Sequence, residues 1–380
     1  MNKKVLLIFG TRPEAIKMAP VFHALKALPD LSVEVCVTGQ HREMLDQVIE
    51  LFDIDITKDL NVMTEEQDLF SLTSKLLMEL RSSLTENRPD CILIHGDTTT
   101  SMAAALAGFY LDVPVGHVEA GLRTHNLRSP FPEELNRRVS GMIANWHFAP
   151  TQLNRDNLLA ENVSDTQIFV TGNTVVDALH QIRGRIHSDI DLKTRIRNQL
   201  SQHLEFDPQD AGRVILLTCH RRENFGEGLK QVCSAVTELA TANPKNHFIF
   251  PVHLNPNVSE HVKEALGAIV NVHLLKPVSY EVFCYLLDSA YMVLTDSGGV
   301  QEEAPSLGKP VLVMRENTER PEAVTAGTVR LVGADSAQII AGVQELLDHS
   351  IIYDKMAKAH NPYGDGNAAT RIAEILRSTL

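Results

Sequence analysis

One stretch decides the expected fold: residues 294–305, with the sequence LTDSGGVQEEAP. It overlaps the apolar run Tyr291–Leu294, which predicts a buried strand, and a helix is expected from Val300 onward. Between them, Ser297-Gly298-Gly299 forms a turn with almost no side chain. A strand, a glycine turn and a helix N-terminus together favour an anion, because unpaired backbone N–H groups point outward there and glycine lets a phosphate approach closely.

An ordinary tight turn between a strand and a helix would also fit this stretch. The acidic pair Glu302 and Glu303, about one helical turn further on, favours a nucleotide instead. A carboxylate at that place repels phosphate, but it accepts hydrogen bonds from sugar hydroxyls. Phosphate at the glycines and ribose at a glutamate together indicate a nucleotide site.

The order of strand, loop and helix recurs along the chain. In the first half we expect strands at 5–9, 33–38, 91–95, 113–118 and 146–149, and helices at 14–28, 40–52, 69–84, 99–111 and 132–143. In the second half we expect strands at 168–171, 214–218, 247–252, 272–275, 291–294 and 311–314, a helical stretch at 175–205 and a last helix at 368–380. Such alternation predicts parallel, doubly wound sheets.

The 380-residue chain is long enough for two domains. We expect an α/β fold of two Rossmann-like, doubly wound domains that face a central cleft. The first domain would span 1–170 and the second, nucleotide-binding domain 171–367, with the helix 368–380 packing back on the first. Open α/β sheets bind ligands beyond the carboxyl ends of their strands.

Composition excludes several classes of partner. Hydrophobic residues make up 44% and charged residues 22% of the chain, as in globular proteins. The formal net charge of −13 argues against nucleic acid or an anionic membrane as the main partner. The five cysteines are scattered, which indicates a reducing compartment, and no apolar run approaches the roughly 18 residues of a membrane span.

Charged residues follow the predicted strand ends of the first half. Arg12 lies at a helix start and Lys17 about one turn later, where the helix dipole also favours an anion; a surface carboxylate would suit Arg12 equally well. Asp97 could cap the helix that follows it, although the neighbouring Thr98 could do so as well. Glu119 ends a buried strand, is not a cap and is costly to desolvate, which favours a functional role.

Further candidates are a carboxylate pair, two histidines and an arginine. Glu133 and Glu134 lie in the first turn of a helix, where carboxylates are electrostatically favoured, so neither stands out alone. His220 follows a predicted strand beside two arginines, a setting that suits a phosphate ligand or a proton carrier near neutral pH. His253 occupies the same place after the next strand, and Arg320 is a further cation in a loop.

Some signatures are absent from the sequence. No G-x-G-x-x-G motif follows a predicted strand, and there is no P-loop. No His, Cys and Asp residues occur at the spacing of a metal site. We therefore expect neither a nicotinamide cofactor nor a required metal.

Ten segments carry a resemblance to a known family. They are FGTRPEAIKMAP at 9–20, QHREMLD at 40–46, HGDTTT at 95–100, GHVEAGLRT at 116–124, TGNTVVD at 171–177, HRRE at 220–223, PVHLNPN at 251–257, TDSGGVQEEAPSLGKP at 295–310, ERPEAV at 319–324 and HNPYGDG at 360–366. Together they resemble the non-hydrolysing bacterial UDP-N-acetylglucosamine 2-epimerases over nearly the whole chain. The resemblance implies a fold like that of the GT-B glycosyltransferases and a homodimer in the cytoplasm. It also implies the reversible conversion of UDP-N-acetylglucosamine to UDP-N-acetylmannosamine for surface polysaccharide synthesis.

The same resemblance implies particular site residues. The positions that would contact the nucleotide sugar are Arg12, Lys17, Asp97, Glu119, His220, Val278, Phe283, Ser297, Gly298, Gly299, Glu303 and Arg320. The positions that match catalytic residues are Asp97, Glu119, Glu133 and His220. Many bacterial members of the family are activated by their own substrate at a neighbouring site, and Gln40 and His253 match part of it.

Inversion at carbon-2 must break a carbon–hydrogen bond that no adjacent carbonyl activates. Without a dinucleotide fingerprint, the remaining route is anti elimination of UDP across carbons 1 and 2, through 2-acetamidoglucal, and re-addition after protonation on the other face. Asp97, Glu119 and Glu133 are the candidate acid and base groups. Three alternatives stay open: a hydrolysing 2-epimerase, a GT-B glycosyltransferase that needs an acceptor, and a sensor that binds without turnover.

Overall fold

The computed structural model describes the chain except for residues 1, 40–41, 65–66, 222–223 and 253–254. It divides into two compact units: unit 1 comprises residues 1–178 and 363–380, and unit 2 comprises residues 179–362. The sequence placed the corresponding divisions at 170 and 367. The first division falls later because helix α7, Thr174–Ser188, begins in unit 1 and continues into unit 2.

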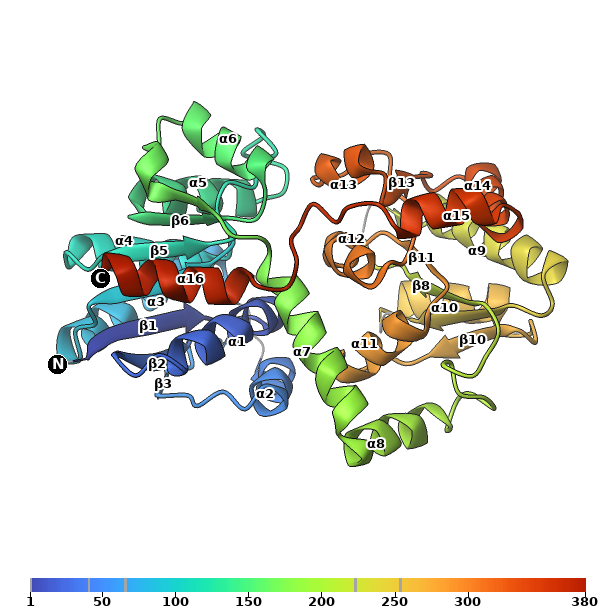
Figure 1. Cartoon of the computed structure of the whole chain (residues 1–380), viewed down its shortest axis with the longest axis horizontal. Helices are drawn as coiled ribbons and strands as arrows, with labels where there is room; N and C mark the ends of the chain where they lie inside the picture. Colours follow the sequence, from blue (N-terminus) through green and yellow to red (C-terminus); the bar gives the residue numbers. More distant parts are fainter. Residues whose placement is uncertain (1, 40–41, 65–66, 222–223, 253–254) are drawn as a thin grey trace. The chain divides into compact units, whose positions relative to one another are not determined.

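The described part of unit 1 contains a seven-stranded parallel sheet in the order β3-β2-β1-β4-β5-β6-β7 (Figure 1). Its strands are β1 Lys3–Phe9, β2 Leu31–Val37, β3 Lys58–Asp59, β4 Cys91–His95, β5 Val115–Val118, β6 Trp146–Ala149 and β7 Ile168–Val170. Its helices are α1 Arg12–Lys26, α2 Arg42–Leu51, α3 Leu69–Glu86, α4 Thr99–Tyr110, α5 Glu133–Ile143, α6 Gln152–Ala160 and α16 Ala368–Thr379. The strand order reverses between β1 and β4, where sheets of this kind bind ligands.

The described part of unit 2 contains a six-stranded parallel sheet in the order β10-β9-β8-β11-β12-β13. Its strands are β8 Val214–Thr218, β9 His247–Pro251, β10 Val272–Leu275, β11 Met292–Thr295, β12 Val311–Val313 and β13 Val329–Leu331. Its helices are α8 Ile190–Leu200, α9 Glu227–Ala242, α10 Pro256–Leu266, α11 Tyr280–Ser289, α12 Gly298–Glu303, α13 Pro321–Ala326, α14 Ser336–Asp348 and α15 Ser350–Ala357. Counted from the first strand of each unit, both sheets contain the Rossmann order 3-2-1-4-5-6, so the predicted α/β class is confirmed.

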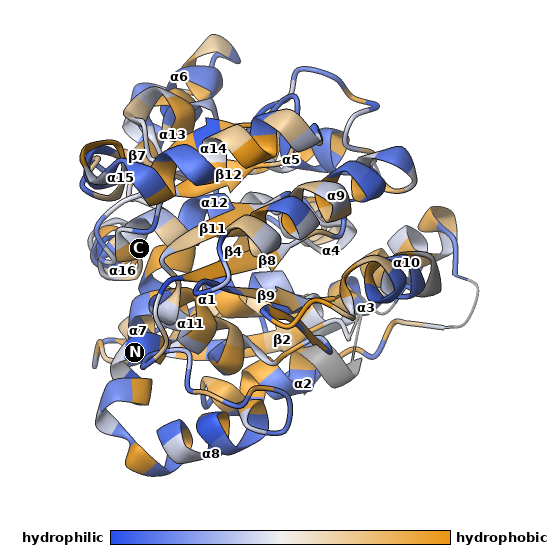
Figure 2. Ribbon diagram, turned by 90° about the vertical axis from the view of Figure 1, so that its right-hand side faces the viewer, coloured by the Kyte–Doolittle hydropathy of each residue, from blue (hydrophilic) through white to orange (hydrophobic). Residues whose placement is uncertain are grey.

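Burial on both faces explains why the central strands are almost wholly apolar. On β1, Leu6 and Ile8 join the cluster formed with α3 and α4, and Val5, Leu7 and Phe9 are also buried. Figure 2 shows the same property for β11, which is orange, whereas the more exposed α8 alternates between blue and orange. Parallel sheets covered by helices on both faces have this pattern. No described helix combines the length and apolar character needed to cross a bilayer.

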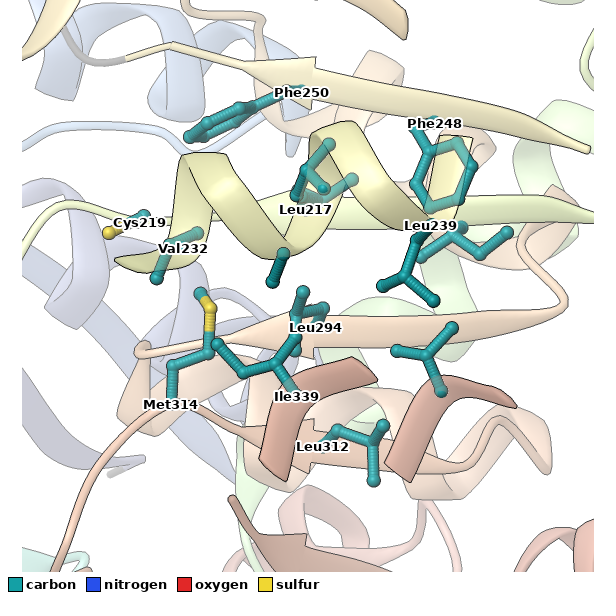
Figure 3. Packing of buried hydrophobic residues seen from close by; sticks show 14 of the residues in the cluster. Leu217, Cys219, Val232, Leu239, Phe248, Phe250, Leu294, Leu312, Met314 and Ile339 are labelled. Atoms are coloured by element: carbon teal, nitrogen blue, oxygen red, sulfur yellow. The ribbon is translucent and has the colours of Figure 1, made fainter. Parts of the chain in front are cut away.

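The core of unit 2 anchors the turns that carry its candidate residues. Leu217, Leu294 and Leu312 come from the adjacent strands β8, β11 and β12, and they pack with Leu239 of α9 and Ile339 of α14 (Figure 3). Each of these five side chains is at most 1% exposed. The carboxyl ends of β8 and β11 are therefore fixed by packing immediately before their polar turns begin.

The structure differs from the sequence-based expectation in one helical stretch and in two short strands. The predicted continuous helical stretch at 175–205 is broken at Asp189, whose carboxylate accepts hydrogen bonds from the Asp191 and Leu192 N–H groups at 3.0 Å and so caps α8. The strands β3 and β13 were not predicted, because runs of two and three residues are too short to show a period.

The C-terminal helix α16 packs against α1 within unit 1. Its N-cap residue, Asn367, makes no side-chain capping bond. Instead, the Asp177 carboxylate of α7 accepts a hydrogen bond from the Ala369 N–H at 2.9 Å. A carboxylate from a distant part of the sequence therefore caps the last helix, at the end where the helix dipole favours negative charge.

This cap makes stability depend on pH. Burial raises the pKa of Asp177 to about 6, above the value of about 3.9 for an unfolded aspartate. As the pH rises, Asp177 therefore loses its proton in the unfolded chain before it does so in the folded protein. Below about pH 4 the group is protonated in both states and its contribution to stability is complete. That contribution is lost as the pH rises to about 6, because ionisation favours the unfolded chain.

We expect Asp177→Asn to remove this loss, because the amide oxygen still accepts from Ala369 and no longer titrates. At about pH 7 the variant should be more stable than the parent by up to roughly 3 kcal/mol, and no more stable than it at about pH 4. Chemical denaturation at the two pH values measures this, with the exposed Asp156→Asn as control. Equal stability of variant and parent at neutral pH would contradict the assignment.

Candidate active site

Glu119 occupies a strained and nearly buried position at the end of β5. Its φ of 64° is left-handed, which costs a residue other than glycine about 1 kcal/mol or more. Its side chain is 11% exposed, and its Oε2 forms an ion pair with Lys17 Nζ of α1. Asn173 Nδ2 donates a hydrogen bond to the same oxygen at 3.2 Å, and His95 Nε2 lies 3.8 Å from it. Strain and burial together are typical of a functional carboxylate rather than of a surface residue.

The two cations expected near the first strand end are placed differently. Lys17, predicted to contact the nucleotide sugar, pairs with Glu119 inside unit 1. Arg12 begins α1, is half-buried and forms no ion pair with any described residue. The alternative of a surface carboxylate for Arg12 therefore has no support in the described part of the chain.

Asp97 is held by helix α5. Thr98 caps α4 by accepting a hydrogen bond from the Ser101 N–H at 3.1 Å, so Asp97 is not needed as the cap. The Asp97 carboxylate pairs with the Arg137 guanidinium, and Asn136 Nδ2 donates to the Asp97 carbonyl at 2.9 Å. Removal from water raises the pKa of Asp97, against the opposing effect of Arg137. A carboxyl of this kind can hold or release a proton closer to neutral pH than an ordinary aspartate.

The adjacent residues Glu133 and Glu134 have separate roles. Glu134 is fully buried and accepts hydrogen bonds from the Thr124 and His125 N–H groups at 3.0 and 3.1 Å and from Arg137 at 3.2 Å. It therefore holds the loop that follows Glu119's strand and positions the arginine that faces Asp97. Glu133 has a buried Oε2 with no hydrogen-bond partner among the described residues. The described part of the chain therefore does not satisfy this oxygen.

Glu14 ties two strand-end turns together. Its Oε2 accepts hydrogen bonds from the Gly10 and Thr11 N–H groups at 3.1 and 2.8 Å, and its Oε1 accepts one from the Thr98 hydroxyl at 2.7 Å. It is 2% exposed, and burial raises its pKa. The turn after β1 and the turn that carries Asp97 are thus fixed to one side chain.

The two histidines beneath this cluster are neutral near pH 7. Burial lowers the pKa of His95 to about 4 and that of His117 to about 3. His117 Nε2 donates to the Gly96 carbonyl at 2.7 Å, which fixes the backbone just before Asp97. His95 Nε2 is buried without a hydrogen-bond partner in the described part of the chain. The positive charge around Glu119 and Asp97 therefore comes from Lys17 and Arg137.

In unit 2, Asp296 organises the turn that contains His220. It is fully buried after β11 and accepts hydrogen bonds from the His220 and Arg221 N–H groups at 3.0 and 2.9 Å and from Asn224 Nδ2 at 3.1 Å. His220 Nδ1 lies 3.4 Å from the other carboxylate oxygen, and its side chain is 43% exposed. Asp296 thus fixes the backbone of His220, and the imidazole stays partly exposed to solvent.

The glycine turn and Glu302 of unit 2 lie against Arg320. Its Nε donates to Glu302 at 2.6 Å, and a Cβ placed on Gly298 would lie 2.6 Å from its Nη1. Only glycine allows this close approach. Glu303 instead accepts a hydrogen bond from the Tyr280 hydroxyl at 2.8 Å. The two glutamates therefore differ: one positions a cation, and the other is held by a tyrosine.

The remaining predicted positions are less informative. Val278 precedes α11 and Phe283 lies within it, and both are half-buried. Gln40 and His253, predicted to match part of a regulatory site, lie outside the described residues. No group of three His, Cys, Asp or Glu side chains in the described ranges could hold a metal ion. The sequence did not single out Arg137, Asn173 or Asp296, whose roles depend on partners far away along the chain.

Known proteins resemble this chain over its whole length. The family model described as UDP-N-acetylglucosamine 2-epimerase matches residues 23–377. UDP-N-acetylglucosamine 2-epimerases of Salmonella typhimurium and Campylobacter jejuni are 54% and 50% identical to it, over 99% of this chain and 98% of each relative.

Solved structures agree with this result. The Neisseria meningitidis UDP-GlcNAc 2-epimerase bound to UDP-GlcNAc matches with a TM-score of 0.91 and 48% identity, over 99% of this chain and 100% of that one. The Methanocaldococcus jannaschii enzyme in complex with UDP-GlcNAc and UDP matches with a TM-score of 0.81 and 32% identity, over 99% of both chains. The predicted family and the GT-B-like α/β class are confirmed: the chain belongs to the UDP-N-acetylglucosamine 2-epimerase family.

Proposed function

We propose that this protein interconverts UDP-N-acetylglucosamine and UDP-N-acetylmannosamine by inverting carbon-2 of the sugar, without net hydrolysis. The observation that carries the proposal is the set of three carboxylates around the strand ends of unit 1. Asp97 is held by Arg137, Glu119 is held by Lys17, and Glu133 has a buried oxygen that no described residue bonds. Family membership supplies the substrate class, since relatives are named for this sugar nucleotide.

In the first step, one carboxylate removes the proton from carbon-2. The bond between carbon-1 and the UDP oxygen breaks, and its electron pair leaves with UDP, so that 2-acetamidoglucal and UDP are formed. Asp97 suits proton transfer because its pKa is raised, which brings its titration nearer to the working pH. Glu119, which is paired with Lys17, is proposed to accept a proton or to stabilise positive charge developing on the sugar.

In the second step, a second acid group delivers a proton to the opposite face of carbon-2, and UDP adds again to carbon-1. Inversion requires groups on two faces of the sugar, which is a reason for more than one carboxylate. The departing UDP needs an anion site, for which we propose Ser297, Gly298, Gly299 and Arg320 in unit 2, together with His220 and Arg12. Glu303, Val278 and Phe283 are proposed to contact the nucleotide.

We also propose that the active protein is a homodimer. This rests on the resemblance of its sequence motifs to a dimeric family. Light scattering after size-exclusion chromatography measures the mass directly, and about 84 kDa, twice the 42.1 kDa of one chain, is the expected result. A mass near that of one chain would contradict the dimer and leave the catalytic proposal intact.

Proton NMR in deuterium oxide tests the reaction. The purified protein is incubated with UDP-N-acetylglucosamine alone, and the expected product is UDP-N-acetylmannosamine carrying deuterium at carbon-2, with the sugar still attached to UDP. Free N-acetylmannosamine and UDP would instead demonstrate the hydrolysing reaction. An unchanged substrate would overturn the epimerase proposal and favour a transferase that needs an acceptor.

A further inference from the structure

Two of the sequence motifs, TGNTVVD at 171–177 and HNPYGDG at 360–366, meet within unit 1. The Asn173 N–H donates to the Tyr363 carbonyl at 2.8 Å, and Arg371 Nη1 donates to the Thr171 carbonyl at 3.0 Å. A Cβ on Gly172, whose φ is +95°, would lie 3.3 Å from the Tyr363 carbonyl oxygen. We call the contact between residues 171–177 and 363–371 the junction. The chain passes between the two units just beyond both of its segments, at 178/179 and 362/363.

Asn173 connects this junction to Glu119. It is 3% exposed, and its Oδ1 accepts a hydrogen bond from the Val175 N–H at 3.1 Å. That bond decides which way the amide faces, so Nδ2 is directed to Glu119 Oε2, at 3.2 Å. The backbone of the same residue is fixed by Tyr363. The junction therefore fixes the backbone of Asn173, and the turn of Asn173 itself fixes the orientation of its amide.

We propose that Asn173 is a positioning residue for Glu119, aligned by the junction between residues 171–177 and 363–371. The inference rests on the proposed function, because it assigns a supporting role to a carboxylate of that site. A carboxylate that accepts an additional hydrogen bond is stabilised in its charged form and held in one rotamer. The competing interpretation is a buried asparagine that only completes the hydrogen bonds of its own turn.

The charges that face Glu119 come from several elements. Lys17 of α1 pairs with it, and His95 of β4 lies 3.8 Å away. Asp97, in the turn after β4, adds a second carboxyl that is itself paired with Arg137 of α5. The Asn173 amide is a neutral donor in this group, so changing it alters the balance of charge at Glu119 directly.

The test replaces Asn173 by aspartate, which keeps an acceptor for Val175 and turns the donor that faces Glu119 into a second carboxylate. The pKa of Glu119 should rise by about one unit, because like charges oppose ionisation. The pKa is measured from the pH dependence of the Glu119 carboxyl ¹³C chemical shift, and the signal is assigned because it disappears in Glu119→Gln. This measurement does not require turnover. The kcat should fall about 10- to 100-fold with KM within about threefold, as for groups that orient a reacting side chain.

Three further variants complete the design. Asn173→Ala should show a smaller rise in the pKa of Glu119 and a similar fall in kcat, and it replaces the aspartate variant if that one does not fold. Gly172→Ala leaves the amide in place but brings a Cβ against Tyr363, so a fall in kcat there would support alignment by the junction. Asn145→Ala, which loses one bond to the Val115 N–H at the opposite end of β5, should leave both readouts unchanged.

The outcomes separate this inference from the proposed function. An unchanged Glu119 pKa in Asn173→Asp, with kcat within about threefold of the parent, would overturn the positioning role. Normal turnover of Gly172→Ala would overturn alignment by the junction alone. A parent protein that leaves UDP-N-acetylglucosamine unchanged would overturn the proposed function, while the ¹³C titration would still decide whether Asn173 acts on Glu119.

Discussion

Asp97→Asn is expected to lower kcat for epimerisation about 100- to 10,000-fold, the range that positioned acid or base groups contribute. The amide cannot take or return a proton, whereas the parent carboxyl has a raised pKa that suits proton transfer. Affinity for UDP should stay within about threefold of the parent, because Asp97 is not among the residues proposed to hold the departing UDP. Coupled turnover assays and calorimetric titration with UDP measure the two quantities.

The Asp97→Asn experiment needs a control for a general loss of structure. Arg137, which loses a charged partner in this variant, keeps its hydrogen bond to Glu134 at 3.2 Å, so only a small loss of thermal stability is expected. Asp90→Asn is the matched control, since Asp90 also forms an ion pair, with Lys3 at 3.2 Å, and lies at the opposite end of β4 from Asp97. Near-normal turnover of Asp97→Asn would remove Asp97 from the catalytic residues.

The neighbouring glutamates of α5 give the second large effect, and each serves as the control for the other. Glu133→Gln should lower kcat by about 100-fold or more, because its buried oxygen has no other partner in the described chain. Its melting temperature should match that of the parent. Glu134→Gln should instead destabilise the protein by roughly 3 kcal/mol, because the buried carboxylate accepts from two arginines and two backbone N–H groups at once, and an amide N–H would face those donors.

Circular dichroism melts and turnover assays on both variants distinguish a catalytic role for Glu133 from a structural one. The contrast between the two variants is the informative quantity, since they differ by one position in the same helical turn. Equal loss of stability in both would mean that Glu133 is also a structural residue. Full activity of Glu133→Gln would exclude it from proton transfer.

The sequence was sufficient where the signal is local. Hydrophobic periodicity and glycine turns predicted the central strands. Asp97 and Glu119 were identified because they directly follow two of these strands, and the carboxyl ends of parallel strands meet at one edge of a sheet. The choice between Asp97 and Thr98 as the cap of α4 stayed open, because both residue types cap helices well. The structure shows that Thr98 is the cap.

The sequence was insufficient where a role depends on a distant partner. Glu133 and Glu134 have the same local pattern, and only the folded chain brings the Thr124 and His125 backbone to one of them. Asp296 was visible as the end of a strand, but its bonds to the turn after β8 require the pairing of β8 with β11. Asn173 lies in one of the sequence motifs, but the sequence alone indicated no role for it. Its partners Glu119 and Tyr363 lie 54 and 190 positions away along the chain.

The arrangement of α16 also affects how the protein is made. Unit 1 begins at the start of the chain but is completed only by residues 363–380, whose buried Ile372 and Leu376 lie on the helix that packs against α1. Unit 2 is continuous from 179 to 362 and so leaves the ribosome in full before unit 1 does. During synthesis the second unit can therefore fold while the first still exposes part of its core, the reverse of the usual N-terminal-first order. Synthesis of residues 363–380 is therefore required before unit 1 can complete its core.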